Sequence, residues 1–136
     1  MNNDLENARE FFAKDVFATK TTGIVIEDVK ECYAKCSLKI DSRHINAMNN
    51  VMGGAIFTLA DFTFAVASNF NQVPTVTTTS QITYLSGVKG DTLYSESRLI
   101  KNGRTTSFYE IEITDNLGTK VALVTESGMK IPPSKN

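Results

Sequence analysis

The segment VMGGAIFTLADFTFAVA, residues 51–67, decides the fold of this chain. It is apolar on nearly all sides of a helix, so it predicts a central helix that other elements must cover. Gly53 and Gly54 mark the junction between a polar loop and this helix. Asp61 lies in its middle, where an unpaired buried carboxylate would be costly or would take up a proton. Asp61 is therefore either a satisfied structural group or a functional one, and both interpretations stay open.

The segments on either side of this helix have the two-residue period of strands. Leu5, Ala8 and Phe12 first indicate a short amphipathic helix near the N-terminus. Two antiparallel strands are expected over 23–29 and 33–40, where apolar and polar residues alternate. Four more strands, expected as a meander, follow Pro74 and are separated by turn signals such as Asn102-Gly103. Their expected ranges are 75–85, 91–100, 105–114 and 120–131.

This order of elements predicts an α+β fold in which a curved antiparallel sheet wraps around one long central helix. The length of 136 residues, with no linker or repeat, predicts a single domain over 1–136. Within it, residues 1–20 are expected to form an N-terminal helical segment and residues 132–136 a loose tail.

Charge and composition exclude several classes of partner. The chain has 14 basic and 15 acidic residues and a net charge of -1, so it lacks the basic field that attracts nucleic acid or anionic membranes. The N-terminus has no export signal, and the apolar segment is shorter than the ~20 residues of a membrane span. Cys32 and Cys36 are interpreted as reduced thiols on one face of a strand, without a metal site. We therefore expect a cytoplasmic protein with no nucleic-acid, membrane or metal partner.

The glycine pair predicts a second functional element. The N–H groups of Gly53 and Gly54 would lie at the positive end of the helix, with no side chain to block a ligand, and could hold a developing oxyanion. A tight turn or close packing would also explain the pair. Asp61 follows Gly53 by eight residues, or ~12 Å along a helix. One chain cannot easily bring both to one carbonyl group, whereas two antiparallel helices across a twofold interface can.

Residues 44–69 and 77–115 carry a family resemblance. HINAMNNVMGGAIFTLADFTFAVASN and TTTSQITYLSGVKGDTLYSESRLIKNGRTTSFYEIEITD resemble the hotdog-fold acyl-CoA thioesterases of the phenylacetate-degradation type. That family has an Asn, then His-Gly-Gly, an Asp on the central helix, and a Ser or Thr on the next strand. The resemblance extends from about residue 23 to residue 131. It implies the hotdog fold and acyl-CoA thioester hydrolysis.

The resemblance also implies roles for individual residues. Asp61 matches the carboxylate that attacks the thioester or activates water, and Gly53 matches the backbone N–H that polarises the carbonyl group. Asn46 matches the polar residue that positions water or substrate from the partner chain. Thr77 matches the strand hydroxyl near the carboxylate, with Thr79 as an alternative on the same face. The family's active sites lie at a dimer interface, so a homodimer or a dimer of dimers is implied.

Two residues of the motif region depart from the family. Met52 stands where the family has His, and its side chain neither donates a hydrogen bond nor titrates. Asn49 stands where the family often has Gly, and Asn tolerates the left-handed conformation. The single histidine of the sequence, His44, is interpreted as structural rather than as a base.

The substrate is expected to be an acyl-CoA with an aromatic or a short or medium acyl chain, so that coenzyme A is part of the substrate and no cofactor is needed. Met52 and Gly54 are expected to contact it, and Lys101 and Arg104 could meet the coenzyme's phosphates as local positive charges. Two other functions remain open. One is a non-catalytic hotdog protein that binds acyl-CoA or another small ligand, and the other is a hydratase or dehydratase of the same fold.

Overall fold

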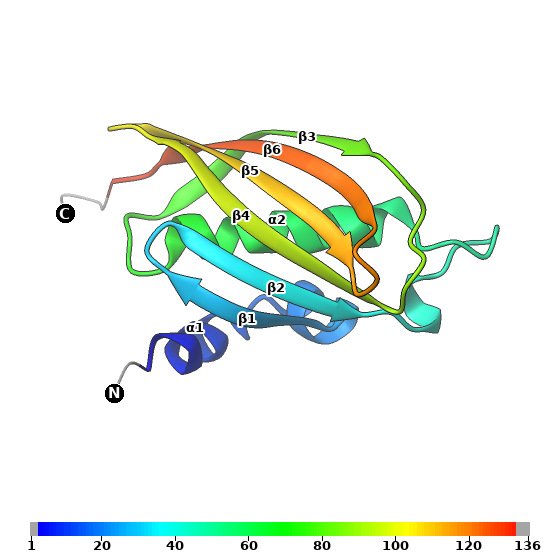
Figure 1. The fold of residues 1–136 in the computed structure, drawn as a ribbon. Coiled ribbons are helices and arrows are strands. Elements are labelled where there is room, and N and C mark those ends of the chain that lie inside the picture. The colour runs from blue at the N-terminus through cyan, green and yellow to red at the C-terminus, as the bar shows by residue number, and fades with distance from the viewer. Residues whose placement is uncertain (1–2, 133–136) are drawn as a thin grey trace.

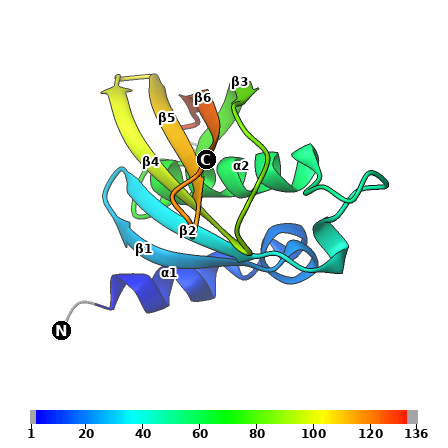
Figure 2. The same cartoon turned by 45° about the vertical axis from the view of Figure 1, so that its right-hand side comes forward.

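A computed structural model describes residues 3–132, so most of the expected tail, 133–136, lies outside the described residues. A six-stranded antiparallel sheet curves around the long helix α2, and α1 lies beside β1 (Figures 1 and 2). The bounds are α1 Asp4–Phe12, η1 Phe17–Thr22, β1 Ile24–Lys30, β2 Tyr33–Lys39, η2 Ser42–His44, α2 Gly53–Asn69, β3 Thr75–Tyr84, β4 Thr92–Asn102, β5 Thr106–Asp115 and β6 Lys120–Lys130.

Helix α2 is the centre of the core, as its apolar sequence predicts. Leu59, Ala60 and Val66 are fully buried, and Phe64 packs edge-to-face on Tyr109 of β5 with ring centroids 5.5 Å apart. Phe62 makes a similar contact with Phe12 of α1 at 6.1 Å. The sheet thus covers one side of α2 and α1 covers part of another. Within residues 3–132, no helix has both the length and the apolar character that crossing a membrane requires.

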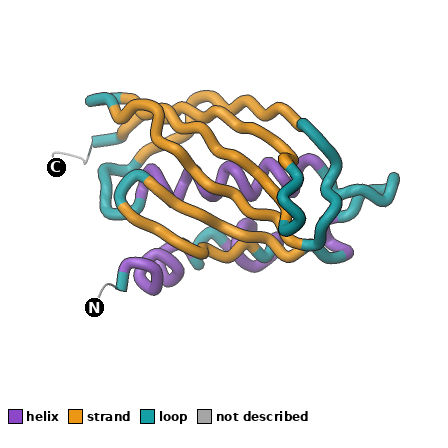
Figure 3. The backbone as a smooth tube through the Cα atoms, viewed as in Figure 1, coloured by secondary structure: helices purple, strands orange, loops and turns teal. Residues whose placement is uncertain are grey.

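The order of strands corrects one prediction. The sheet runs β1-β2-β4-β5-β6-β3, so only β4, β5 and β6 form a meander, and β3 lies at the far edge beside β6. The loop of residues 85–91 therefore has to pass the ends of two strands to reach β4, and Figure 3 shows it among the loops at one end of the sheet. Strand pairing between distant segments cannot be read from a local alternation of residues.

Asp115, the last residue of β5, fixes this crossing loop. It is 3% exposed, and its carboxylate accepts four backbone N–H bonds. The donors are Gly90 (3.0 Å) and Lys89 (2.9 Å) of the loop, and Leu117 (3.0 Å) and Thr119 (2.9 Å) of the β5–β6 turn. Burial alone would raise the pKa of Asp115, but these donors hold it well below its usual range.

The N-terminal segment differs from the single expected helix. α1 ends at Phe12, and a π-helical segment, η1, extends helical structure to Thr22, beyond the expected limit at residue 20. Gly23 then adopts φ +94°, which turns the chain into β1. The expectation that both cysteines lie on one strand face is wrong for Cys32, which occupies the β1–β2 turn with φ 60°, while Cys36 is fully buried on β2.

Candidate active site

The N-terminus of α2 presents free backbone donors. Met52 occupies the cap position and makes no side-chain capping bond, and its carbonyl accepts from Ala55 N at 3.0 Å. The N–H groups of Gly53 and Gly54 have no acceptor among the described residues. Tyr84 of β3 donates its hydroxyl to the Gly53 carbonyl at 2.9 Å, which fixes this end of the helix to the sheet. The first turn is therefore held in place with its donors unused, as an anion site requires.

The loop before α2 projects from one end of the molecule, where the chain of residues 45–52 extends away from the sheet (Figure 1). Asn46 organises it, because its Oδ1 accepts from Met48 N and Asn50 N, both at 3.0 Å. This leaves the amide N–H groups of Asn46 as its available donors. Asn49 has φ 64°, which confirms that Asn takes the left-handed position. Met52 is 56% exposed, and Met48 of the same loop is 79% exposed.

His44 is a structural residue, as predicted. It is 3% exposed, its Nδ1 accepts from Asp41 N at 3.0 Å, and its Nε2 lies 2.7 Å from the Thr22 carbonyl oxygen. These two partners require the tautomer with the proton on Nε2. Since both ring nitrogens are occupied, His44 is not free to act as a base.

Asp61 is half-buried on α2, and its polar neighbour comes from the sheet. Thr58, one turn earlier, gives its hydroxyl to the Gly54 carbonyl at 2.8 Å. The charge of Asp61 acts instead on Glu126 of β6, where it raises the pKa of the carboxyl group. Glu126 is 2% exposed, and its Oε1 accepts from Ser80 Oγ at 2.5 Å. Two carboxyl groups and a hydroxyl thus meet between α2 and the sheet.

The pKa of Glu126 reflects this environment. Burial has the largest effect and raises the pKa, the hydrogen bond from Ser80 lowers it, and the charge of Asp61 raises it again, to about 8. Glu126 therefore holds a proton at neutral pH while Asp61 faces it. Sequence analysis missed Glu126. Its signal was a carboxylate on the face of β6 that Ala122 and Val124 make apolar.

A bulge in β3 decides which hydroxyls face this pair. The register shifts between Thr77 and Thr79, so that Thr77 pairs with Gly128 and Ser80 pairs with Glu126. Thr77 and Ser80 therefore share the inner face of the sheet. Thr79 pairs with Ser127 on the outer face. The prediction that Thr79 could replace Thr77 on the same face is wrong, because the bulge at Thr78 reverses the alternation.

A hollow of about 320 Å³ opens beside Asp61, between η1 and α2. Its walls are mostly apolar, and two of its residues, Val16 and Phe17, are exposed by 50% and 66%. The lining residues are Asp15, Val16, Phe17, Ala18, Thr58, Asp61, Phe62 and Ala65. Asp61 is one of two carboxylates on this lining, so a ligand in the hollow would lie next to it.

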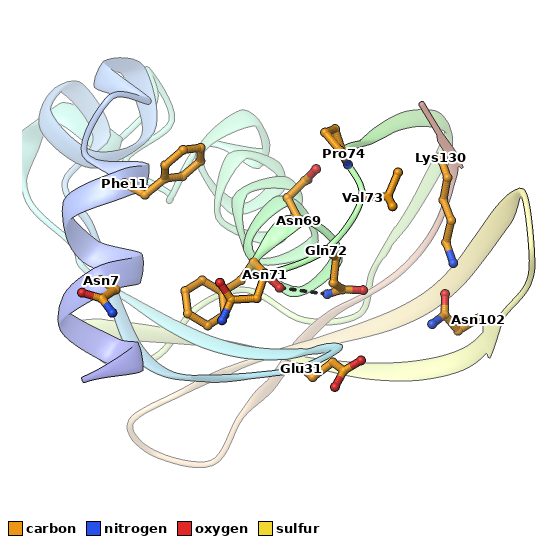
Figure 4. A pocket seen from close by; sticks show the side chains of 11 residues that line it. Asn7, Phe11, Glu31, Asn69, Asn71, Gln72, Val73, Pro74, Asn102 and Lys130 are labelled. Atoms are coloured by element: carbon orange, nitrogen blue, oxygen red, sulfur yellow. Dashed lines mark hydrogen bonds between the residues drawn. The ribbon is translucent and has the colours of Figure 1, made fainter. Parts of the chain in front are cut away.

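A larger cavity, of about 970 Å³, lies at the other end of α2. Figure 4 shows amide side chains around it, including Asn69, Gln72 and Asn102, with Lys130 at one side. It contains neither the carboxyl pair nor the free N–H groups of α2. Lys101 and Arg104 are both exposed at the nearby β4–β5 turn, at the end of the sheet opposite the loop before α2 (Figure 1). Within one chain, the structure does not bring these two cations to Gly53.

Comparisons with known proteins identify the family. A family model described as the thioesterase superfamily matches residues 48–122, which include the glycine pair, Asp61 and the β3 hydroxyls. The chain belongs to the thioesterase superfamily. It is 32% identical over 119 residues to the acyl-coenzyme A thioesterase PaaI of Escherichia coli, covering 87% of this chain and 84% of that protein.

Solved structures of similar proteins agree with this assignment. The E. coli PaaI protein from the phenylacetic acid degradation operon superposes with a TM-score of 0.87 and 26% identity, covering 96% of each chain. The smu.793 protein of Streptococcus mutans, bound to acetyl CoA, gives a TM-score of 0.76 and 27% identity over 82% of this chain and 91% of that one. The predicted hotdog fold, the resemblance to phenylacetate-degradation thioesterases and the assignment as a thioester hydrolase are therefore confirmed.

Proposed function

We propose that this thioesterase hydrolyses acyl-CoA with Asp61 of one chain and the Gly53 N–H of a second. The observation that supports this most strongly is that the backbone donors and the carboxylate lie at separate places on one helix. The free donors are at the start of α2, Asp61 lies eight residues further along the same helix, and no other carboxylate lies among the first residues of α2. The relative that is bound to acetyl CoA supports the choice of thioester.

In the proposed reaction, the thioester carbonyl oxygen accepts from the Gly53 N–H, and the partial positive charge of the helix terminus stabilises the oxyanion. The Asp61 carboxylate takes a proton from water while the water oxygen adds to the carbonyl carbon, and this proton later passes to the leaving thiolate. Alternatively, the carboxylate attacks that carbon itself, and once the thiolate has left, water hydrolyses the acyl–Asp61 anhydride, which releases the acid, frees Asp61 and supplies the proton of the thiol. The C–S bond then breaks and coenzyme A leaves as a thiolate. The products are a carboxylic acid and the thiol.

The second chain would join at the open edge of the sheet. β3 is an edge strand whose residues 76–79 are all exposed, and an unpaired edge offers backbone donors and acceptors to another copy. Twofold pairing there sets two α2 helices antiparallel, so that Asp61 of each approaches Gly53 of the other. In this arrangement, Asn46 donates its amide N–H groups to substrate or water, and Thr77 directs its hydroxyl toward the partner's loop.

The hollow between η1 and α2 is suited to the acyl group, because Val16, Phe17 and Phe62 give it apolar walls next to Asp61. Its volume of about 320 Å³ fits an aromatic or short to medium acyl chain. Met52 and Gly54 would line the passage toward the coenzyme. Lys101 and Arg104 remain the proposed phosphate contacts, supplied from the chain that brings the β4–β5 turn to the site.

The first part of the test measures hydrolysis of short, medium and aromatic acyl-CoAs by the wild type, by Asp61→Asn and by the control Glu112→Gln. Glu112 is exposed on the outer face of β5, so its loss should leave turnover unchanged. Asp61→Asn should reduce kcat by about 10²- to 10⁴-fold. Wild-type binding of acyl-CoA without turnover would instead support the non-catalytic alternative.

The second part tests whether the site is shared between chains. Gly53→Pro removes the N–H at the first helical position, where proline is favoured, and Met52 already has the extended ψ of 133° that a following proline requires. Its Cβ would lie 2.9 Å from the Tyr84 hydroxyl, so the change is made in a Tyr84→Phe background, and Tyr84→Phe alone is the control. The double variant should lose about 10²- to 10³-fold in kcat. Co-refolding it with Asp61→Asn should restore activity, because one mixed site then has both groups intact. If two inactive variants that form mixed dimers restore nothing, the shared site is wrong.

A further inference from the structure

Glu126 is buried opposite Asp61, and no family motif in the sequence assigned it a role. Its Oε1 accepts from Ser80 Oγ at 2.5 Å, which fixes one side of the carboxyl group. Its Oε2 is buried and has no partner at ordinary hydrogen-bonding distance among the described residues. The group that faces it is the carboxylate of Asp61. A buried polar oxygen is rarely left unpaired, so the position of Oε2 opposite Asp61 calls for an explanation.

We propose that Glu126 is a positioning residue for Asp61, and that its protonated carboxyl group shares a proton with the Asp61 carboxylate and holds it in the reactive orientation. The inference rests on the proposed role of Asp61. Ser80 contributes by fixing Oε1, so that Oε2 carries the proton toward α2. Glu126 is 2% exposed and does not itself reach substrate.

The surroundings of Glu126 make the pair independent of other charges. From β3 comes the neutral Ser80, and from β5 comes its register partner Tyr109. Tyr109 donates to the Ala67 carbonyl at 3.5 Å, and burial raises its pKa, so it is a neutral phenol. From α2 comes Asp61. Among the described residues, Asp61 is the charged side chain whose field acts on Glu126.

This arrangement predicts how hydrolysis depends on pH. While Glu126 holds its proton, the pair has one negative charge and one shared hydrogen bond. When that proton is lost, Asp61 loses its donor and meets a second negative charge, so its orientation changes. Turnover should therefore fall on the alkaline side as Glu126 ionises. Met52, which replaces the motif histidine, does not titrate, so it does not contribute to the alkaline fall in turnover.

The test compares kcat and KM for the wild type, Glu126→Gln and Glu126→Leu from about pH 5.5 to about pH 9.5 on the best acyl-CoA. The Gln amide keeps an N–H donor but does not titrate. It should retain turnover near neutral pH and lose the alkaline fall. The Leu variant has no donor, so its kcat should drop by about 10- to 100-fold with little change in KM. A purely structural role would alter stability and leave the pH profile in place.

A second measurement does not depend on activity. Infrared difference spectra of the wild type against Glu126→Gln should show a protonated carboxyl group at neutral pH, and its titration midpoint should move down in Asp61→Asn. An ionised Glu126 at neutral pH, or identical pH profiles for wild type and Glu126→Gln, overturns the inference. If Asp61→Asn is inactive while both Glu126 variants behave as wild type, only the role of Glu126 fails. Full activity in Asp61→Asn instead refutes the proposed function.

Discussion

Asp115 and Glu126 are equally buried carboxyl groups in one sheet, and their surroundings drive their pKa values in opposite directions. Asp115 is 3% exposed and accepts four backbone N–H bonds, so its pKa is lowered. Glu126 is 2% exposed and accepts one hydroxyl bond opposite a second carboxylate, so its pKa is raised. Burial raises the pKa of both carboxyl groups; the four backbone donors to Asp115 reverse that effect, whereas the single hydroxyl donor to Glu126 does not.

The two sites also differ in what their donors connect. The donors to Asp115 are backbone groups of the crossing loop and the β5–β6 turn, so its negative charge ties segments of the fold together. The partners of Glu126 are side chains of β3 and α2 at the proposed reaction site. We therefore expect loss of Asp115 to act mainly on stability and loss of Glu126 mainly on chemistry.

The largest effect on stability is expected for Asp115→Ala. It leaves four N–H groups without their acceptor and should lower the free energy of unfolding by about 3 to 5 kcal/mol, measured by urea denaturation. Asp115→Asn keeps one acceptor oxygen, so its free energy of unfolding should lie between those of the wild type and Asp115→Ala. Because the pKa of Asp115 is lowered in the folded state, the loss is full at neutral pH and shrinks only below about pH 4.

Asp91→Asn is the matched control, because Asp91 is an exposed residue of the same loop and its ion pair with Lys39 is on the surface. It should unfold close to the wild type. Equal destabilisation by the Asp91 and Asp115 changes would mean that the four N–H bonds are not what fixes the loop.

A smaller effect of opposite sign is expected for Glu126→Gln. The folded pKa of Glu126 is about 8 against an ordinary 4.5, so the folded state keeps a proton that the unfolded state has lost. The free energy of unfolding of the wild type therefore falls as pH rises between these values. Relative to the wild type, that of the Gln variant should increase by about 1 kcal/mol per pH unit. Thermal unfolding at about pH 6 and about pH 8 checks this. A constant difference between the two proteins would show that Glu126 does not titrate in this range.

The smallest effect is expected for Ser80→Ala, which removes the hydrogen bond that lowers the pKa of Glu126. The pKa should rise further, and the free energy of unfolding should fall by about 1 kcal/mol or less. Infrared titration of the Glu126 carboxyl group measures the shift. Thr79→Ala, on the outer face, should leave that titration unchanged. An equal shift in both variants would contradict the register on the two sides of the bulge.

Local sequence patterns were sufficient to predict the central helix and the strands, but not the order of the strands in the sheet. The apolar run around Asp61 predicted α2, and alternation predicted all six strands within a few residues. The position of β3 beside β6 was not predicted, because pairing of distant strands depends on the whole sheet. The π-helical turn of η1 and the bulge at Thr78 were also missed, since neither leaves a periodic signal.

The candidate site was predicted where one segment contains it and missed where two segments meet. Gly53 and Asp61 lie in one run, so their spacing could be interpreted directly. Glu126 lies on the last strand, and its relation to Asp61 exists only after β6 packs over α2. The roles of Asn46, Thr77, Lys101 and Arg104 depend on a second chain and stay predictions.

The edge position of β3 also affects the order in which the chain folds. β4, β5 and β6 are joined by short turns and can pair early, whereas β3 has to pair residue 84 with 122 and residue 75 with 130. Contacts so far apart in sequence form slowly, because a long loop must close first. Ser80 comes with β3, so it reaches Glu126 only when this last strand docks. We expect refolding to restore the helix and the meander before it restores the carboxyl pair.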